Sequence, residues 1–304
     1  MVDELCSFKG IVVAKKANFF IVKIDSTDIY NNDIDYKYFH KSSHLMCTSR
    51  KRLMHHGLVI NVGDYVFLEA IDWKTNRAVI SGLEARKSLL IKPPVANVTD
   101  IVVVLSVKKP EFNFDQASRF LLTAERSNLK VHLILTKIDL ISHQTLSVQI
   151  SRFQSWGYQP LGVSSINGQG ISNILTQFKK IKLAVICGPS GVGKSSLLQL
   201  LLPNESIVVG DLSGKLERGR NTTRHVQLYS FGDKSLVADT PGFNRPDLDC
   251  NIASLQLLFP EIRSQLKKSS CRFRNCLHCD EPGCRINTNW ERYEQYRKLI
   301  QENI

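Results

Sequence analysis

The sequence predicts a chain of three successive parts: a small OB-type β-barrel, a central α/β domain with a parallel sheet, and a short, cysteine-rich helical module. Short runs of β-branched and aromatic residues, without a convincing helix, fill the first part. Strand-like and helix-like segments then alternate, which is typical of a parallel sheet with crossover helices. Four cysteines cluster near the end of the chain. We expect the three parts to span residues 1–90, 91–245 and 246–304.

The composition indicates a globular protein with an anionic partner. Its 304 residues suit two or three domains, and an apolar fraction of 43% excludes a disordered chain. Lys and Arg number 40 against 28 Asp and Glu, so the formal net charge is +12. This surplus favours a nucleic acid over a membrane, because no basic amphipathic helix stands out. A basic surface that only keeps the protein soluble is the alternative.

The sequence also indicates the cellular compartment in which the protein is expected. The first residues, MVDELC, carry acids and no apolar signal core, and no apolar run reaches membrane-spanning length. Cysteines crowded at one end favour metal ligation over a disulfide framework. We therefore expect the protein to lie in a reducing compartment, the cytoplasm or an organelle matrix, without membrane association. We also expect it to be a monomer.

Strands are expected in the first part over 10–14, 18–25, 63–70 and 77–82, where residues alternate or are β-branched. Between them, residues 36–63 carry five Lys or Arg, four histidines and no acid, and are expected to form a loop. A basic loop on a small barrel is typical of a nucleic-acid-binding module. A solvated loop without a ligand would have the same composition.

Lys92, Pro93 and Pro94 are expected to form a linker, since consecutive prolines interrupt both helices and ladders. The central part should then contain strands 100–105, 131–135, 158–163, 181–187 and 236–239 and helices 114–128, 143–155 and 195–202. The carboxyl ends of parallel strands meet at one edge of a sheet. Segments that follow these strands should therefore lie together.

A phosphate-binding pattern, G-x-x-x-x-G-K-[ST], follows strand 181–187 and is matched at every fixed position. Glycines in such a loop let successive N–H groups face phosphate oxygens, and the following helix N-terminus favours anions. A chance glycine turn is the alternative, but the order of strand, loop, Lys-Ser and helix argues against it. The predicted nucleotide-binding residues are Gly188, Pro189, Ser190, Gly191, Val192, Gly193, Lys194, Ser195 and Ser196.

A tetrapeptide that matches [NT]-K-x-D follows the second strand of the central part, and a Ser-Ser loop follows the third. The Asp carboxylate of such a box accepts hydrogen bonds from the N1–H and the exocyclic amine of guanine, a pair of donors that adenine lacks. The Lys stem covers the ring. Each pattern is weak when it occurs alone. The predicted base-contacting residues are Thr136, Lys137, Ile138, Asp139, Ser164 and Ser165.

Further polar residues are expected to bind Mg²⁺ and to contact the terminal phosphate. The Lys of the phosphate loop supplies a cation, and the Ser hydroxyl after it is placed to bind Mg²⁺. A D-x-x-G box at a strand end would hold Mg²⁺ through water and sense the γ-phosphate with its Gly N–H. One of two adjacent threonines would close on the ion as a switch. The residues predicted to carry this chemistry are Lys194, Ser195, Thr222, Thr223, Asp239 and Gly242.

Together these patterns indicate a GTPase domain in which the base box precedes the phosphate loop, the reverse of the usual order. The domain is therefore circularly permuted, which is possible where termini lie close in space. With Val95-Ala-Asn97, Asp239-Thr-Pro-Gly-Phe243 and the C-terminal cysteines, the chain resembles the RsgA (YjeQ) family over nearly its whole length. This resemblance implies a GTPase that the small ribosomal subunit stimulates and that helps this subunit mature late in assembly.

Two positions depart from the family pattern. A His commonly precedes the threonine pair, whereas this chain has Asn221, which can hydrogen-bond water but is not a titratable base. Thr136 stands where Asn is more usual, so a side-chain oxygen remains and the amide is lost. Phe243 follows the family, which has a hydrophobic residue in place of a water-orienting Gln. The resemblance therefore implies slow hydrolysis until ribosomal contact organises the switch.

The C-terminal cluster offers five soft ligands, where a tetrahedral Zn²⁺ needs four. On chemistry alone, Cys279 could replace its neighbour His278. The family resemblance implies one structural zinc ion held by Cys271, Cys276, His278 and Cys284.

Short helices are expected on both sides of the cluster, over 252–258 with Pro260 and along the apolar stripe from Trp290 to Ile300. The aromatic residues of the stripe should pack in a core, with base stacking as the alternative. The arginines between the ligands, at 272, 274 and 285, would face RNA.

The sequence thus predicts an Mg²⁺-dependent GTP hydrolase that acts as a release switch on the small ribosomal subunit, with the barrel and the zinc module binding rRNA. The alternative is an RNA-binding assembly scaffold in which GTP only stabilises the fold and turnover is lost.

Overall fold

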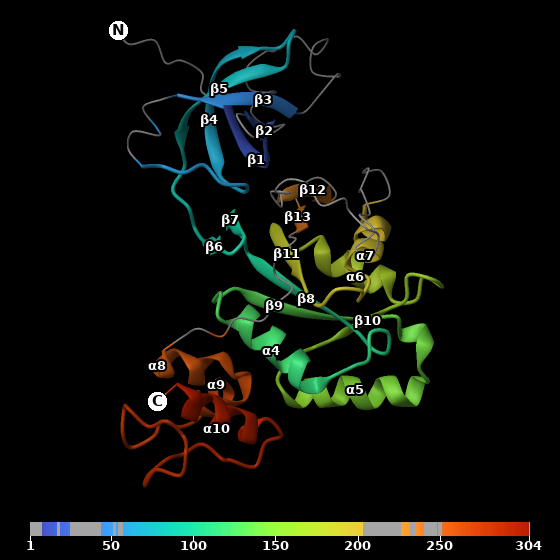
Figure 1. Cartoon of the computed structure of the whole chain (residues 1–304), viewed down its shortest axis with the longest axis vertical. Coiled ribbons are helices and arrows are strands. Elements are labelled where there is room, and N and C mark those ends of the chain that lie inside the picture. The colour runs from blue at the N-terminus through green and yellow to red at the C-terminus, as the bar shows by residue number, and fades with distance from the viewer. Residues whose placement is uncertain are drawn as a thin grey trace, which may run out of the picture. The chain divides into compact units, whose positions relative to one another are not determined.

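The computed structural model describes residues 8–16, 19–24, 44–50, 53, 57–202, 226–231, 235–239, 248 and 251–303 (Figure 1). The chain divides into two compact units. The first comprises 1–100, 177–186 and 201–243, and the second comprises 101–176, 187–200 and 244–304.

Five strands of the first unit close into a barrel. These are β1 (Phe8–Lys16), β2 (Phe19–Ile24), β3 (His44–Ser49), β4 (Tyr65–Asp72) and β5 (Arg77–Leu83). The strand order β1-β2-β3-β5-β4 returns to β1 through a β1–β4 pairing. The β3–β5 pairing is parallel and the other four are antiparallel. The predicted OB-type barrel is therefore confirmed.

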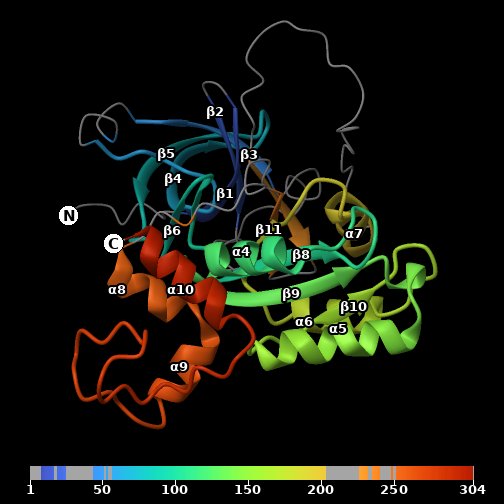
Figure 2. The same cartoon turned by 60° about the horizontal axis from the view of Figure 1, so that its bottom comes forward.

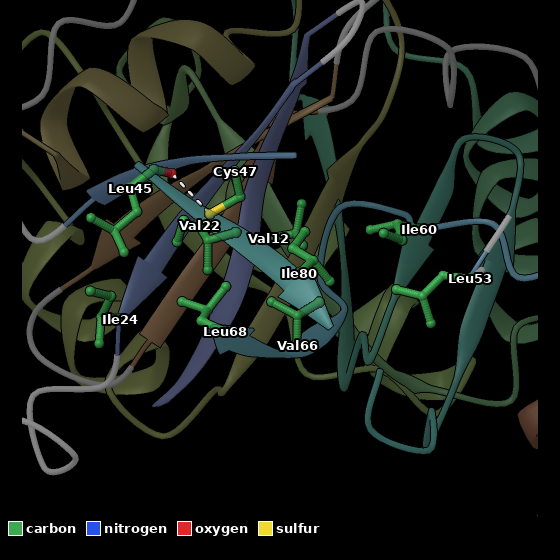
Figure 3. Packing of buried hydrophobic residues seen from close by; sticks show 11 residues of the cluster. Val12, Val22, Ile24, Leu45, Cys47, Leu53, Ile60, Val66, Leu68 and Ile80 are labelled. Atoms are coloured by element: carbon green, nitrogen blue, oxygen red, sulfur yellow. Dashed lines mark hydrogen bonds between the residues drawn. The ribbon is translucent and has the colours of Figure 1, made fainter. Parts of the chain in front are cut away.

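Alternate residues of the barrel strands fill its interior (Figure 3). Val12, Leu45, Leu68 and Ile80 are fully buried there. Cys47 is also buried, with its Sγ 3.7 Å from the Leu45 carbonyl oxygen. Burial raises the pKa of the Cys47 thiol to about 12, so this cysteine is a core residue and stays protonated.

Strand β3 lies within residues 36–63, so the prediction of a continuous loop there is wrong. The strand has inward-facing residues at Leu45 and Cys47 and more exposed residues between and beside them, the period-two pattern of a half-buried strand. That pattern is short and is flanked by basic and histidine-rich segments, which dominate the composition of the region. Residues 25–43, with part of the predicted basic loop, lie outside the described residues.

The expected linker at Lys92–Pro94 is the turn of a small hairpin. Strand β6 (Leu89–Ile91) pairs with β7 (Pro94–Ala96), and Pro is tolerated as the first residue of a strand. The hairpin contacts the segment that precedes β4 of the barrel, because Val95 forms a parallel bridge with Val62. Asn97 Nδ2 also donates to the Gly63 carbonyl oxygen at 2.9 Å. The prolines end one short strand and begin another, so this segment is not an unstructured linker.

Three more strands belong mainly to the first unit: β11 (Leu183–Cys187), β12 (Gln227–Phe231) and β13 (Ser235–Asp239). β11 runs parallel to β13, with Ile186 opposite Asp239. β12 is antiparallel to β13 and was not predicted. Every residue of β11 is buried, as expected for a strand of a parallel sheet that is covered on both faces.

The second unit holds strands β8 (Asp100–Ser106), β9 (Lys130–Thr136) and β10 (Leu161–Val163), in the order β10-β9-β8. Helices α4 (Phe114–Glu125) and α5 (His143–Ser155) connect them. The remaining elements of this α/β region are the 3₁₀ turn Ile138–Leu140 and helices α6 (Ile171–Phe178) and α7 (Lys194–Leu201). The predicted alternation of strands and helices is confirmed.

Side-chain caps explain where α4 and α5 begin. Asn113 accepts from the Gln116 N–H at 2.9 Å, and Ser142 accepts from the Thr145 N–H at 3.1 Å. Each cap satisfies a backbone donor that has no partner inside the helix. The start of α5 at His143 and its end at Ser155 coincide with the predicted bounds.

The C-terminal helices pack against α4 in the second unit (Figure 2). They are α8 (Ile252–Leu255), the 3₁₀ turn Gln256–Leu258, α9 (Pro260–Leu266) and α10 (Tyr293–Glu302). Leu122 of α4 belongs to the same buried cluster as Phe259, Tyr296 and Ile300. The aromatic stripe is therefore a core element, as expected. Pro260 begins a separate helix, α9, and does not merely end the preceding one.

A buried ion pair fixes this packing. Arg292 donates to both carboxylate oxygens of Glu261, at 2.8 and 2.5 Å, and to Ser118 Oγ of α4 at 3.1 Å. Its guanidinium also lies 4.6 Å from the centre of the Trp156 ring. Removal of either partner would leave a buried charge without compensation, which is strongly destabilising. This pair joins the C-terminal helices to α4 and to the residue after α5.

We expect Gly63→Ala to detach the β6–β7 hairpin. Gly63 has φ +89°, and a Cβ there would lie 2.1 Å from the Ala96 carbonyl oxygen. Overlap with rigid backbone should cost roughly 3 kcal/mol or more. Amide exchange of residues 95–97, measured by mass spectrometry, should then become faster.

Gly57→Ala is the matched control. Gly57 also has positive φ (+68°), but nothing lies within 4 Å of its Cβ position. Only the cost of holding an alanine in a left-handed conformation, about 1 kcal/mol, should lower the stability. Equal acceleration of exchange at residues 95–97 in both variants would contradict the steric explanation.

Candidate functional site

The glycine-rich loop joins β11 to α7, as the phosphate-binding pattern predicts. Gly188, Gly191 and Gly193 all have positive φ, at 141°, 78° and 97°. At Gly188 a Cβ would lie 2.1 Å from the Val104 carbonyl oxygen of β8, so a side chain cannot be accommodated there. The close approach of this loop to β8 thus depends on glycine.

Lys194 reaches back across the loop that precedes it. Its Nζ donates to the Gly188 and Pro189 carbonyl oxygens, each at 2.8 Å. The helix α7 starts at the same residue, and the Leu197 N–H donates to the Gly193 carbonyl oxygen at 2.9 Å. An ammonium group and the N-terminus of a helix therefore lie at the two sides of one loop, an arrangement that attracts anions.

The [NT]-K-x-D box lies against this loop, although more than fifty residues separate the two in sequence. Thr136 Oγ1 lies 2.5 Å from the Val192 carbonyl oxygen and 3.2 Å from the Leu105 carbonyl oxygen. Lys137 Nζ donates to the Gly191 carbonyl oxygen at 2.7 Å. The expectation that segments after parallel strands lie together is met for these two segments.

The remaining residues of the box face in different directions. Lys137 has φ 59°, a left-handed conformation that turns the chain into the 3₁₀ turn Ile138–Leu140. Ile138 is buried, whereas Asp139 is exposed. A carboxylate at the surface of the sheet edge is accessible to a ligand.

The Ser-Ser loop begins at the same edge of the sheet. Val163 pairs with Thr136 in the parallel β9–β10 ladder, so Ser164 follows β10 where Lys137 follows β9. Ser164 is fully buried, and its Oγ accepts from the Ile166 and Asn167 N–H groups at 3.2 and 3.3 Å. It is therefore a structural residue of the loop, while Ser165 is exposed.

Five of the residues discussed for phosphate and Mg²⁺ chemistry lie outside the described residues: Asn221, Thr222, Thr223, Gly242 and Phe243. The backbone of Asp239 is described and ends β13 opposite Ile186, as expected for a D-x-x-G box at a strand end. In the phosphate loop, Ser195 is half-buried, and Ser190 and Ser196 are exposed.

The loop after β8 is part of this region and was not predicted from the sequence. Lys137 Nζ donates to the Lys109 carbonyl oxygen as well as to the phosphate loop. Pro110, Phe112 and neighbouring residues line a small cavity together with Pro189 and Val192. The residues from Val107 to Asn113 match no nucleotide-binding pattern, so only the tertiary structure identifies them.

The C-terminal cluster brings together Cys271, Cys276, His278 and Cys284, whose ligand atoms all lie within 4.8 Å of one another. His278 Nδ1 lies 3.5 Å from Cys271 Sγ, 3.4 Å from Cys276 Sγ and 3.6 Å from Cys284 Sγ. A tetrahedral Zn²⁺ with ordinary bond lengths requires N–S separations of about 3.6 Å. The donor set therefore fits such an ion.

Cys279 is not part of this group. Its Sγ lies 3.4 Å from the Leu277 carbonyl oxygen. The ring of His278 is buried, and burial lowers its pKa, which favours the neutral imidazole that a metal requires. Of the two adjacent candidates, the geometry selects His278, through Nδ1.

Glu281 organises the turn that carries these ligands. Its two oxygens accept from the Leu277 and Cys279 N–H groups, each at 2.7 Å. Burial alone would raise the pKa of Glu281, but hydrogen bonds from its own backbone N–H and from those of Leu277 and Cys279 outweigh burial and hold the pKa below its usual value. Tyr293 of α10 donates to the His278 carbonyl oxygen at 3.1 Å. Glu281 within the turn and Tyr293 of α10 thus both hold the backbone around His278.

No helix within the described ranges has the length and apolar character needed to cross a bilayer.

Solved structures share this architecture over nearly the whole chain. The crystal structure of YjeQ from Thermotoga maritima matches with a TM-score of 0.76 and 29% identity, covering 97% of this chain and 98% of that one. The structure of YloQ, described as a circularly permuted GTPase, matches with a TM-score of 0.75 and 27% identity, over 97% and 94% of the two chains. Fold and chain order together define a circularly permuted P-loop GTPase.

Sequence relatives identify the family. The profile described as RsgA GTPase matches residues 83–249. A protein of Prochlorococcus marinus (strain NATL2A), named small ribosomal subunit biogenesis GTPase RsgA, is 50% identical, over 97% of this chain and 94% of its own length. A protein of Synechococcus sp. (strain CC9311) with the same name is also 50% identical, over 96% and 93%. The chain belongs to the RsgA GTPase family.

We expect Glu281→Gln to weaken metal binding by roughly ten- to a hundred-fold, because a neutral amide presents one acceptor to two N–H donors and loosens the ligand turn. Competition of the purified protein with a chromophoric zinc chelator measures this affinity. The visible absorption of bound Co²⁺ should remain that of a tetrahedral site with three sulfur ligands.

Asp280→Asn is the control, since Asp280 is the neighbouring acid outside the clamp and Asn tolerates its positive φ of 70°. It should leave metal affinity within about two-fold of the unchanged protein. Equal losses in the two variants would show that general negative charge, and not the clamp made by Glu281, supports the site.

Proposed function

We propose that this chain hydrolyses GTP during assembly of the small ribosomal subunit and leaves the subunit when hydrolysis is complete. The observation that carries the proposal is the contact of Thr136 and Lys137 with the Val192 and Gly191 carbonyl oxygens, because it joins a base-reading box to a phosphate loop. The names of the relatives supply the ribosomal context.

Each end of the nucleotide would have its own partners. The guanine would meet the Asp139 carboxylate, with the Lys137 stem over the ring and the backbone near Ser165 beside it. The phosphates would lie in the loop from Gly188 to Ser196, where Lys194 neutralises negative charge. Positioning and electrostatic stabilisation suffice for phosphoryl transfer to water, so no covalent intermediate is required.

Mg²⁺ would neutralise charge on the β- and γ-phosphates and orient them. The Ser195 hydroxyl, Asp239 and one of Thr222 and Thr223 are the residues proposed to hold it. The Gly242 N–H would sense the γ-phosphate. Asn221 can hydrogen-bond the attacking water without accepting its proton. Phe243 stands where other GTPases have a water-orienting Gln, so intrinsic hydrolysis would be slow until the ribosome orders the switch.

A zinc ion is the metal proposed for the cluster of Cys271, Cys276, His278 and Cys284, since four sulfur and nitrogen ligands leave no open position. Its role would be structural. Arg272, Arg274 and Arg285 are exposed and alternate with the ligands along the sequence, and they would contact rRNA phosphates. The barrel would form a second rRNA-binding surface.

The proposed domain boundaries are 1–90 for the barrel, 91–245 for the GTPase domain and 246–304 for the zinc-binding domain. We propose that the protein acts as a monomer in the compartment where small subunits are assembled, the cytoplasm or an organelle matrix.

Lys194→Ala tests hydrolysis directly. We expect purified small subunits to stimulate GTP turnover by the unchanged protein and not by this variant, because the phosphate charge is no longer neutralised. Release of inorganic phosphate measures turnover. Lys180→Ala, which removes an exposed lysine elsewhere, should retain stimulation. Binding of subunits without any stimulation of the unchanged protein would favour the scaffold function.

Asp139→Asn tests the base contact. The carboxylate accepts two guanine donors, so the amide should reduce GTP affinity by about 100-fold. The same amide can donate to the second carbonyl of xanthine, and XTP should therefore bind better than GTP. Competition against a fluorescent nucleotide measures both. Asp115→Asn, at the first turn of α4, should change neither, and unchanged GTP preference in Asp139→Asn would remove Asp139 from the site.

A further inference from the structure

The buried Ser106 hydroxyl lies next to the proposed guanine site but belongs to none of its motifs. Ser106 is the last residue of β8 and is 4% exposed. Its Oγ donates to the Lys109 carbonyl oxygen at 2.8 Å. A buried hydroxyl that bonds three residues ahead shapes the loop that follows the strand.

The Lys109 carbonyl oxygen is shared by two donors. Lys137 Nζ donates to it and also donates to the Gly191 carbonyl oxygen at 2.7 Å. One ammonium group is therefore held between two carbonyl oxygens, one from the loop after β8 and one from the phosphate loop. Ser106 determines where the first of these carbonyls lies.

Other contacts hold the same loop beside the site. The Val107 N–H donates to the Thr136 carbonyl oxygen at 3.1 Å, which joins the end of β8 to the residue before Lys137. Pro110 Cδ lies 3.9 Å from the Cβ position of Gly191. The loop thus contacts both the base box and the phosphate loop.

We propose that Ser106 is a positioning residue for guanine-nucleotide binding: through the Lys109 carbonyl it fixes the Lys137 ammonium, and with it the stem that covers the base. This inference rests on the proposed function of Lys137 and the phosphate loop. Ser106 itself does not touch the nucleotide. Its hydroxyl acts by keeping Lys137 in one conformation before the base arrives, which reduces the entropy lost on binding.

Ser106→Ala removes the donor and leaves Lys137 with a less constrained partner. Dissociation of a fluorescent GDP analogue, chased with excess GDP, should become roughly three- to ten-fold faster, the effect of one neutral hydrogen bond. Ser106→Cys keeps a weak donor at similar volume and should give a smaller increase. It also provides the test if the alanine variant does not fold.

A double-mutant cycle distinguishes positioning from a general loss of stability. Lys137→Met keeps an aliphatic stem and removes the ammonium, so Ser106→Ala should have no further effect on dissociation in that background. Ser118→Ala, which removes another buried hydroxyl of the same unit that contacts Arg292 and Gln295, should leave the dissociation rate unchanged.

The outcomes are separable from those of the proposed function. If the unchanged protein does not bind the GDP analogue, the nucleotide site itself is refuted and this inference with it. If it binds, and Ser106→Ala and Ser106→Cys leave dissociation unchanged, only the inference fails. Equal acceleration by Ser106→Ala with and without Lys137 would also overturn it, because the hydroxyl would then act by another route.

Discussion

The contact between the [NT]-K-x-D box and the phosphate loop is the constraint on which the proposed nucleotide site depends. Thr136 and Lys137 bond to the Val192 and Gly191 carbonyl oxygens, which are backbone acceptors on a loop whose N–H groups are needed elsewhere. These hydrogen bonds join the end of β9 to the loop that precedes α7. A change in the position of one segment therefore moves the other.

This constraint also explains how a permuted chain order can keep a GTPase site. The box comes first in the sequence and the loop second, but each follows the carboxyl end of a strand, and hydrogen bonds from Thr136 and Lys137 bring the two segments together. The site requires these contacts. It does not require a particular order of the segments along the chain.

The second unit contains both the proposed base-contacting segment and the cluster of candidate metal ligands. Helix α5 starts shortly after the 3₁₀ turn of the box, and Trp156 follows its last residue. Trp156 Nε1 donates to Glu291 at 2.8 Å, and the next residue, Arg292, forms the buried pair with Glu261. The C-terminal module is thus attached to α4 and α5 by polar contacts with fixed geometry as well as by apolar packing.

The sequence predicted elements whose signals are local. Ser142 caps α5, and the apolar residues of β11 stand next to a glycine loop, so these elements lie close to where the patterns put them. The four zinc ligands that the family resemblance implied are the residues that the fold brings together. For the helix and the strand, propensity, capping and burial all favour the same structure.

Signals that depend on tertiary structure could not be read in this way. Strand β3 is specified by two inward residues, Leu45 and Cys47, within a basic segment, so its composition resembles that of a loop. The role of Ser106 depends on a carbonyl of Lys109, and a backbone acceptor leaves no mark in the sequence. The choice of His278 over Cys279 depends on the backbone turn held by Glu281, whereas ligand chemistry alone allows both.

A crystal structure of the protein bound to GDP and Mg²⁺ is the most direct test of the central claim that one guanine nucleotide joins the early box to the late loop. The account predicts that the Asp139 carboxylate lies within hydrogen-bond distance, about 3 Å, of guanine N1 and N2, while the N–H groups of Gly191 to Ser195 surround the β-phosphate of the same molecule. A nucleotide seated in the phosphate loop with its base away from Asp139 would contradict it.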